Sequence, residues 1–184
     1  MALHRSHGRA MLARVVSASC PAIVYRTIDL ERDADVAYAN YRDAGLASFR
    51  GDGSRISSRE VYLHWLRSRI EEFPDGHVLA HLGERCVGQL ELQVPYGMNV
   101  GYVNLYCVTP AFRGLGFGRL LHEYAERYFR SWEAERIELD VAPSNERAVK
   151  FYRRMGYHFV GSQGRLWRMH RDLRVPHNMG RVGE

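Results

Sequence analysis

The segment from residue 108 to residue 121 constrains the fold more than any other part of this 184-residue chain. It reads VTPAFRGLGFGRLL, in which a strand-like apolar run ends, a proline follows, three glycines alternate and an amphipathic helix begins. Glycines let the backbone approach a ligand closely, and the free N–H groups of a helix N-terminus point toward an anion. The segment therefore predicts a phosphate-binding loop within an α/β domain.

Two common phosphate-binding motifs fit this loop poorly. A Walker loop requires Gly-Lys-Ser/Thr after its spacer, whereas the one lysine of the chain is Lys150. A dinucleotide fingerprint requires G-x-G-x-x-G, and here the third glycine, Gly118, comes one residue early. Acidic residues about twenty positions further on leave a nucleotide-binding domain open as an alternative. The spacing that fits is Arg-x-x-Gly-x-Gly, formed by Arg113, Gly116 and Gly118.

The rest of the pattern predicts one mixed α/β domain. On the strand before the loop, alternation places Val103, Leu105 and Cys107 on one side and Tyr102, Asn104, Tyr106 and Val108 on the other. Strands are expected over residues 22–28, 77–82, 85–94, 101–109, 136–141, 158–161 and 166–171. Helices are expected from a cap at Asp29 to Ala44, from a cap at Ser57 or Ser58 to Ile70, from the glycine loop to Trp132, and from the turn at 142–145 to Met155.

This order of elements, with a glycine-rich loop after the fourth strand, resembles the GCN5-related N-acetyltransferase (GNAT) superfamily. The resemblance spans about residues 22–171 and is most specific over 101–161. It implies a single domain over residues 21–172, with a central mixed, mostly antiparallel sheet of about seven strands and about four flanking helices. The second motif of that family is matched here by Asn145, Ala148, Phe151, Tyr152, Gly156 and Tyr157.

The resemblance implies an N-acetyltransferase that moves an acetyl group from acetyl-CoA to a primary amine by direct attack in a ternary complex. The acceptor stays open between a peptide N-terminus, a lysine side chain and a small amine. A lysine amine is neutral in only about one molecule in 2,500 at pH 7, so the reaction needs a base or a desolvating site. A non-catalytic acyl-CoA-binding module with the same fold is the alternative.

The residues that bind acetyl-CoA are implied by the same resemblance. Backbone N–H groups of the loop would hold the pyrophosphate, the strand before the loop would line the pantetheine arm, and an asparagine would hydrogen-bond that arm. The implied set is Tyr106, Val108, Arg113, Gly114, Leu115, Gly116, Phe117, Gly118, Arg119, Asn145 and Tyr152.

Three residues are candidates for proton transfer. Tyr152 stands where the family places its general acid, which protonates the leaving thiolate. Asp140 lies twelve residues earlier, where bacterial ribosomal-protein N-terminal acetyltransferases carry a catalytic Glu. Its shorter side chain would need a bridging water, and Glu91 on an earlier strand is an equal candidate for the general base.

Composition argues against several other classes of protein. No apolar run approaches the roughly 20 residues that span a bilayer. The three cysteines are too scattered for a disulfide framework or zinc site, so we expect no metal and a cytoplasmic protein. The net charge of +5 comes from the chain ends, without the basic runs of nucleic-acid binders. The expected partners are acetyl-CoA and an amine, with no nucleic acid and no membrane.

The two ends of the chain are expected to lie outside this domain. Residues 1–20 carry three arginines and no acid, which predicts a disordered basic leader. Residues 173–184 are expected to form a C-terminal tail. A homodimer is common in the family, and the sequence leaves it undecided.

Overall fold

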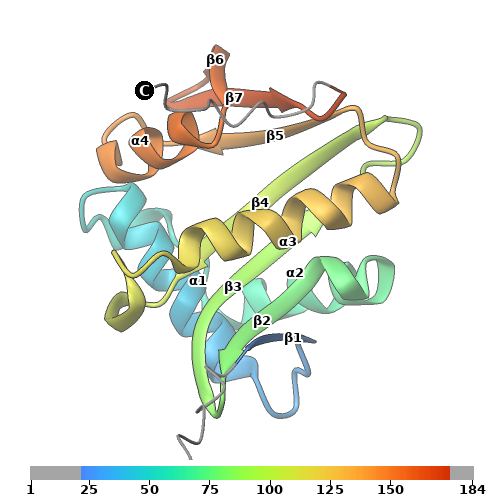
Figure 1. Ribbon diagram of the computed structural model, residues 1–184. Helices are drawn as coiled ribbons and strands as arrows, with labels where there is room; N and C mark the ends of the chain where they lie inside the picture. Colours follow the sequence, from blue (N-terminus) through green and yellow to red (C-terminus); the bar gives the residue numbers. More distant parts are fainter. Residues whose placement is uncertain (1–21, 175–184) are drawn as a thin grey trace, which may run out of the picture.

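Seven strands form one sheet in the order β1-β2-β3-β4-β5-β7-β6 in the computed structural model, which describes residues 22–174. Every neighbouring pair is antiparallel except β4 and β5, which are parallel. This arrangement confirms the mixed, mostly antiparallel sheet predicted from the sequence (Figure 1). The strands are β1 (Ile23–Thr27), β2 (His77–Leu82), β3 (Arg85–Gln93), β4 (Val100–Val108), β5 (Arg136–Val141), β6 (His158–Gln163) and β7 (Leu166–Asp172).

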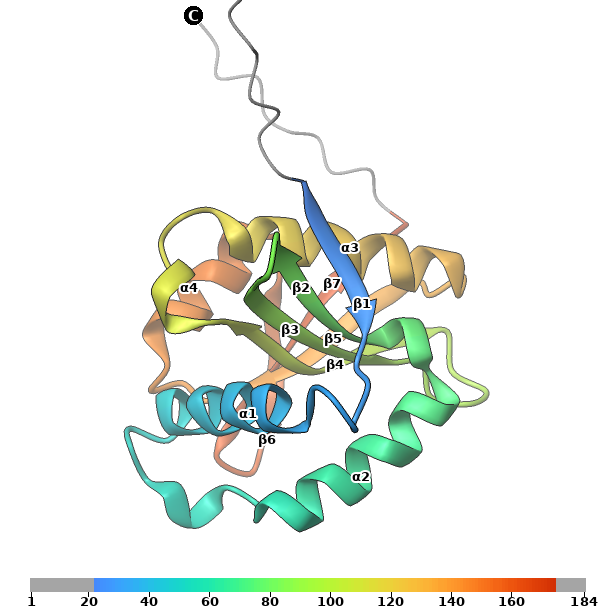
Figure 2. The ribbon, with the colours of Figure 1, turned by 90° about the horizontal axis from the view of Figure 1, so that it is seen from below.

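Four helices cover the two faces of this sheet (Figure 2). The helices α1 (Ala34–Ser48) and α2 (Arg59–Glu72) lie on one face, and α3 (Phe117–Ser131) and α4 (Glu146–Arg154) lie on the other. Short 3₁₀ turns occur at Gly53–Arg55, Pro74–Gly76 and Pro110–Phe112. The predicted leader (1–20) and most of the predicted tail (173–184) lie outside the described residues, and both stay predictions.

The apolar spacing of each helix determines which side it buries. On α3 the buried residues Leu121, Ala125, Tyr128 and Phe129 follow helical periodicity and pack in the larger core cluster between α3, α4 and the sheet. A smaller cluster around Tyr62 joins α1 and α2 to the opposite face. The domain therefore has a core on each side of the sheet.

The predicted start of the first helix was wrong. Asp29 instead accepts a hydrogen bond from the backbone N–H of Glu31 at 3.0 Å, which closes a local turn. The helix begins at Ala34 after Asp33 and continues through Gly45 to Ser48. Gly45 lies inside the helix and permits close packing, because a Cβ there would lie 2.9 Å from a side-chain carbon of Ile56. Ser58 caps α2, as predicted.

The strict alternation predicted for β4 was also wrong. Successive residues of β3 pair with Val103 and Leu105, so Asn104 is an extra residue that forms a β-bulge. The bulge puts Val103 on the same face as Tyr106, in the core beneath α3. Leu105 and Cys107 consequently face the α1 and α2 side.

The strands β4 and β5 pair over only part of their length. Residues Val100–Val103 pair with residues Arg136–Leu139, and no β4–β5 pairing follows. Beyond this point β4 continues along β3 and β5 continues along β7, so the two parallel strands diverge. The divergence begins at the Asn104 bulge, because a bulge bends its strand and ends regular pairing.

The packing of α3 on the sheet predicts that Gly101 cannot be replaced without a loss of stability. A Cβ on Gly101 of β4 would lie 2.2 Å from Cδ1 of the fully buried Phe129. We expect Gly101→Ala to lower the free energy of unfolding by about 1–3 kcal/mol, because the core has no room to accept the methyl group.

Denaturant unfolding measures this effect, with Gly161→Ala of β6 as the matched control. A Cβ on Gly161 would have no heavy atom within 4 Å, so that variant should stay within about 0.5 kcal/mol of the parent. Equal stabilities for the two variants would contradict the packing described here.

Candidate active site

A cavity of about 530 Å³ lies between the diverging ends of β4 and β5. Its walls come from the second half of β4, the end of β5, the glycine loop, the end of α1 and the helix α4. The predicted site residues that line it are Tyr106, Val108, Arg113, Gly114, Gly116, Gly118, Arg119, Asp140, Asn145 and Tyr152.

Three other predicted residues do not line this cavity. The side chain of Leu115 projects into solvent, and the ring of Phe117 packs edge-on against Phe112, 5.3 Å between centroids. Glu91 lies behind the cavity wall, paired across the strands with Leu105, which does line it. The loop prediction therefore identified the right segment, in which Leu115 and Phe117 face away from the cavity.

The glycine loop has the backbone geometry that its sequence demands. Gly114 and Gly116 have φ angles of +81° and +88°, a left-handed conformation that favours glycine. Gly116 is the N-cap of α3, and no side chain caps this helix. The N–H of Arg119 donates to the carbonyl oxygen of Gly116 at 3.0 Å, so the first-turn groups that could meet an anion here are the N–H groups of Phe117 and Gly118.

Arg113 connects this loop to α1. Its Nε donates to the carbonyl oxygen of Val108 at 2.9 Å, and its guanidinium forms an ion pair with Asp43. The side chain thereby holds the loop against the helix on the opposite wall of the cavity. This partnership was not visible in the sequence, because Asp43 lies 70 residues away.

The helix α4 brings a second N-terminus to the cavity. Asn145 is its N-cap, and its Oδ1 accepts the backbone N–H of Ala148 at 3.2 Å. Arg147, in the first turn, and Arg154, at the end of the helix, both line the cavity and form no ion pair with a described residue. Sequence reasoning missed both arginines. For Arg147 the available signal was a cation in the first turn of a helix, where the helix dipole favours an acid, whereas nothing local marked Arg154.

The charged residues of the cavity are unbalanced in favour of cations. Four arginines line it, at positions 113, 119, 147 and 154, against one acid, Asp140. That acid is paired with Arg168, which lies outside the cavity. Arg113 and Arg119 are likewise paired with acids outside the cavity, Asp43 and Glu123. The excess of positive charge therefore comes from Arg147 and Arg154. A cavity with this excess of guanidinium groups and two helix N-termini suits a ligand that carries several negative charges.

Tyr152 brings a neutral phenol to the cavity. The residue is 9% exposed, and its ring lies against those of Tyr106 and Tyr157, at centroid distances of 6.2 and 5.6 Å. Burial raises the pKa of Tyr152 well above its ordinary value of 10. At neutral pH the residue is therefore a proton donor and not a phenolate.

Cys107 also lines the cavity, on β4. Burial raises the pKa of this thiol to about 12, so the thiolate is scarce near neutral pH. The nucleophilic form of cysteine is the thiolate, and Cys107 is thus poorly suited to attack an acyl donor.

Asp140 is bound on both carboxylate oxygens. Arg168 donates to Oδ1 at 2.6 Å and to Oδ2 at 2.9 Å, and the hydroxyl of Tyr102 also donates to Oδ2 at 2.9 Å. The guanidinium and the phenol thereby fix the orientation of this carboxylate.

Glu91 lies in a buried polar network on the α1 and α2 side of the sheet. Its Oε1 accepts hydrogen bonds from the hydroxyl of Tyr62 at 2.6 Å and from Nε2 of Gln89 at 2.8 Å. Gln89 in turn accepts from Asn40 of α1 at 3.2 Å. Burial raises the pKa of Glu91 from 4.5 to about 7, a value suited to proton uptake near neutral pH.

Within residues 22–174, no group of three or more His, Cys, Asp or Glu side chains is arranged to hold a metal ion. No helix in that range is long and apolar enough to cross a bilayer.

The raised pKa of Glu91 predicts a pH-dependent stability. Between pH 4.5 and about 7 the folded state binds more protons at this site than the unfolded state, so stability falls as pH rises. Glu91→Gln keeps the shape and removes the titration. From pH 5 to pH 8 the variant should therefore gain roughly 2–3 kcal/mol relative to the parent.

Urea unfolding at the two pH values tests this prediction, with Glu84→Gln in the exposed β2–β3 turn as the control. The control should follow the parent at both pH values. Parallel curves for Glu91→Gln and the parent would contradict the burial of an ionisable carboxyl at this position.

Comparisons with known sequences identify relatives of this chain. Residues 38–157 match the family model described as the acetyltransferase (GNAT) family. The chain is 38% identical over 60 residues to streptothricin acetyltransferase of Streptomyces lavendulae, a segment that covers 33% of this chain and 32% of that enzyme. It thus spans about a third of the length of that relative. It is 32% identical over 114 residues to an uncharacterized N-acetyltransferase of Archaeoglobus fulgidus, covering 57% of this chain and 76% of that protein.

Solved structures support the same fold. The crystal structure of the PaiA N-acetyltransferase from Thermoplasma acidophilum in complex with coenzyme A superimposes with a TM-score of 0.64 at 19% identity. The match covers 82% of this chain and 99% of that one. Because the family match extends over more than half of the sequence and the fold agrees with it, this chain belongs to the GNAT acetyltransferase family.

Proposed function

We propose that this protein is an N-acetyltransferase that transfers an acetyl group from acetyl-CoA to a primary amine by direct attack in a ternary complex. The observation that carries this proposal is the cavity between β4 and β5, where two helix N-termini, four arginines and a buried phenol meet. Acetyl-CoA has the complementary chemistry, with phosphates at one end and a thioester at the other.

The loop and α4 supply the groups for the phosphates. Backbone N–H groups from Arg113 to Gly118 would bind the pyrophosphate, helped by the dipole of α3. Arg147 and Arg154 would bind phosphate oxygens, since guanidinium forms paired hydrogen bonds with them.

The pantetheine arm would take the place of the missing strand partner. From Asn104 to Val108, β4 is not paired with β5, and backbone groups there would bond the amides of the arm in the manner of an added strand. Oδ1 of Asn145 is used in capping α4, so its Nδ2 is the atom that would donate to the same arm.

The transfer needs two proton movements. The amine nitrogen attacks the thioester carbonyl carbon and the C–S bond breaks. The nitrogen releases its surplus proton to solvent water, and the thiolate takes the phenolic proton of Tyr152. The phenolate then regains a proton from solvent. An ordinary phenol near pKa 10 protonates a thiolate near 8.5 only modestly uphill, and the burial of Tyr152 makes this step harder unless the phenolate is stabilised.

For the general base we favour Glu91 over Asp140. Its pKa of about 7 suits proton uptake from an ammonium group, and because its carboxylate lies behind the cavity wall the proton would reach it through a chain of waters. Asp140, by contrast, is bound on both oxygens by Arg168. The raised pKa of Cys107 supports direct transfer without an acyl-enzyme.

The acceptor is an amine whose class the cavity does not define. A peptide N-terminus, a lysine side chain and a small amine all remain candidates. We propose a reducing cytoplasm as the compartment, which the free thiols of Cys86 and Cys107 support. Thiol release from acetyl-CoA with a free-N-terminus peptide, lysine and spermidine tests the activity. Tight acetyl-CoA binding with no turnover of a wide amine panel would favour a non-catalytic acyl-CoA-binding module.

The loop assignment predicts a charge effect that can be separated from backbone strain. Gly116 has a left-handed conformation that Asn and Asp both tolerate, and both residues are good helix N-caps. Gly116→Asp adds a negative charge beside the proposed pyrophosphate site, whereas Gly116→Asn adds only bulk. We expect the Asp variant to bind acetyl-CoA at least about tenfold more weakly than the Asn variant.

Calorimetric titration with acetyl-CoA measures the two affinities, and thermal unfolding checks that both variants fold. Equal affinities of the two variants for acetyl-CoA would contradict the assignment of this loop as the pyrophosphate-binding site.

The phenol assignment predicts a separate kinetic effect. Tyr152→Phe removes the proton donor without changing the shape of the cavity. It should lower kcat by about tenfold or more while the Kd for acetyl-CoA changes less than about twofold. Steady-state kinetics with the most active amine of the panel measures this effect. A fully active variant would mean that the thiolate takes its proton from another group.

A further inference from the structure

The cavity ends at the point where β4 and β5 begin to pair. The residues of β4 that line it are 104–108, and those of β5 are Asp140 and Val141. Just beyond this end, Val103 is paired with Leu139, and both side chains are buried in the core cluster beneath α3. The inner end of the cavity is therefore closed in the plane of the sheet and on the α3 side.

The carboxylate of Asp140 lies at the same end of the cavity, on the opposite face of the sheet. Leu139 and Val141 of β5 face the core beneath α3, so the alternation of the strand turns Asp140 toward the other side. Its Oδ2 accepts a hydrogen bond from the hydroxyl of Tyr102 on β4 at 2.9 Å. This side chain thus bridges the two strands where they begin to separate, and it forms a wall at the inner end of the cavity.

Arg168 of β7 holds this wall in place. Its Nε donates to Oδ1 of Asp140 at 2.6 Å, and its Nη2 donates to Oδ2 at 2.9 Å. Its Nη1 donates to Glu138 at 3.1 Å, and the guanidinium lies over the ring of Tyr102, 5.4 Å from the centroid. Bidentate, charge-assisted hydrogen bonds of this kind are strong and fix geometry. The carboxylate therefore cannot rotate away from the cavity without losing them.

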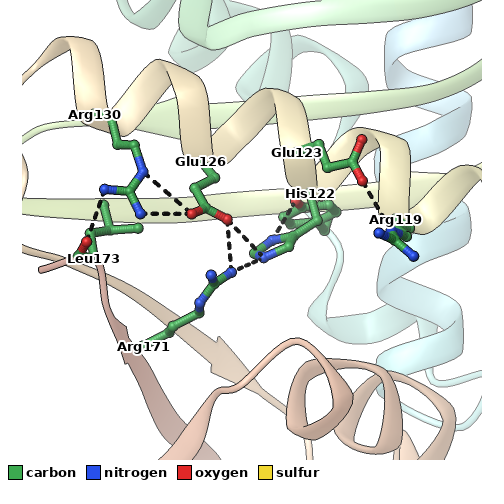
Figure 3. Close-up of polar contacts among 8 residues, drawn as sticks. Arg119, His122, Glu123, Glu126, Arg130, Arg171 and Leu173 are labelled. Carbon is green, nitrogen blue, oxygen red and sulfur yellow. Dashed lines mark hydrogen bonds and ion pairs between the residues drawn. The ribbon is translucent and has the colours of Figure 1, made fainter. Parts of the chain in front are cut away.

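The strand that carries Arg168 is itself anchored from its other face (Figure 3). Nη1 of Arg171, on the α3 side of β7, lies 2.9 Å from Oε2 of Glu126 on α3. Arg130, one turn further along the same helix, donates to the carbonyl oxygen of Leu173 at 2.9 Å. These contacts tie the end of β7 to α3, so Arg168 extends from a strand that is fixed in position.

The position of the acyl group follows from the proposed function, on which this inference rests. With the pyrophosphate at the glycine loop and the pantetheine arm along residues 104–108 of β4, the thioester lies at the far end of the arm, near Asn104. The acyl chain is the terminal group of the donor. It therefore points toward the closed end of the cavity, where Asp140 stands.

We propose that Asp140 is a specificity-determining residue that limits the transferred acyl group to acetyl, and that Arg168 and Tyr102 are the residues that position it. A longer chain would press apolar methylene groups against a hydrogen-bonded carboxylate, and moving that carboxylate would break its bonds to Arg168. One additional methylene in a closed pocket changes selectivity by about 10- to 200-fold.

This role of Asp140 differs from that of a general base in what its removal does. Loss of a general base slows transfer from every acyl-CoA alike, so the preference among donors stays constant. Loss of a wall admits longer chains, so the preference itself changes. The ratio of kcat/KM for two donors separates the two roles, because a uniform loss of activity cancels from it.

The experiment compares acetyl-CoA with butyryl-CoA in the full chain, with the most active amine of the panel as acceptor. Steady-state kinetics gives the ratio of kcat/KM, calorimetry gives the ratio of Kd, and thermal unfolding checks that each variant folds. The parent should prefer acetyl-CoA by about a hundredfold in kcat/KM. Asp140→Ala leaves room for the additional carbons of butyryl and should lower this preference by at least about tenfold. Asp140→Leu has a side chain of the same branching and similar size, so its preference should stay within about threefold of the parent value.

Two further variants test the support of the wall. Arg168→Met frees the carboxylate and should lower the preference by at least about threefold. Glu138→Ala is the matched control, because Glu138 lies on the same face of β5 and pairs with the same arginine but does not line the cavity. Its preference should stay within about twofold of the parent value. The Kd ratios should follow the same order among the variants.

Several outcomes would overturn the inference. A parent that uses butyryl-CoA as readily as acetyl-CoA would do so, as would an unchanged preference in Asp140→Ala or an equal change in Asp140→Leu or Glu138→Ala. If Asp140→Ala fails to fold, an unchanged preference in Arg168→Met would refute it instead. A parent that binds acyl-CoA without turnover would refute the proposed catalysis, while the Kd ratios would still test the wall. Binding of neither donor would refute the proposed acyl-CoA site, a result distinct from all of these.

Discussion

The separation of β4 and β5 is the constraint on which the rest of the structure depends. Two parallel neighbours that pair only from Val100 to Val103 leave the following backbone groups of β4 without a strand partner on one side. Unpaired backbone N–H and C=O groups are costly inside a protein, so a gap of this kind requires either water or a ligand with peptide-like amides. The Asn104 bulge begins the gap, and α4 and the glycine loop bound it.

Charge is organised around the same gap. Arg113 forms an ion pair with Asp43 and so holds the loop against α1. Arg168 forms an ion pair with Asp140 of β5. The charges of these residues are therefore neutralised within the protein. Arg147 and Arg154 form no ion pair with a described residue and are left to an anionic ligand.

Sequence reasoning recovered those parts of the fold and site that depend on local chemistry. The glycine-rich loop before α3, the start of α4 after the turn at residues 142–145, and the strands β2 and β3 each follow from what a few adjacent residues can do. The order of strands and the helices on the two faces followed from the resemblance. The predicted start of the first helix was wrong because the side chain of Asp29 closes a local turn, five residues before the helix begins.

Other features depend on residues that meet only after folding. Asn104 fits the alternation of its strand, and nothing adjacent marks it as a bulge. The partners of Arg113 and Asp140 lie 70 and 28 residues away, so their side chains could not be recognised as occupied. The burial that raises the pKa of Glu91 exists only once α1 and α2 pack on the sheet, and the hydrogen bonds from Tyr62 and Gln89 lower that pKa in part.

Hydrogen–deuterium exchange with and without saturating acetyl-CoA tests the central claim most directly, since it reports both binding and its location. We expect slower exchange on acetyl-CoA addition in the segments around Asn104–Arg119 and Asn145–Tyr152, and little change in β6 and in the edge strand β1. Protection confined to other segments, or no protection at acetyl-CoA concentrations that saturate related enzymes, would contradict the assignment of the β4–β5 gap as the acyl-CoA site.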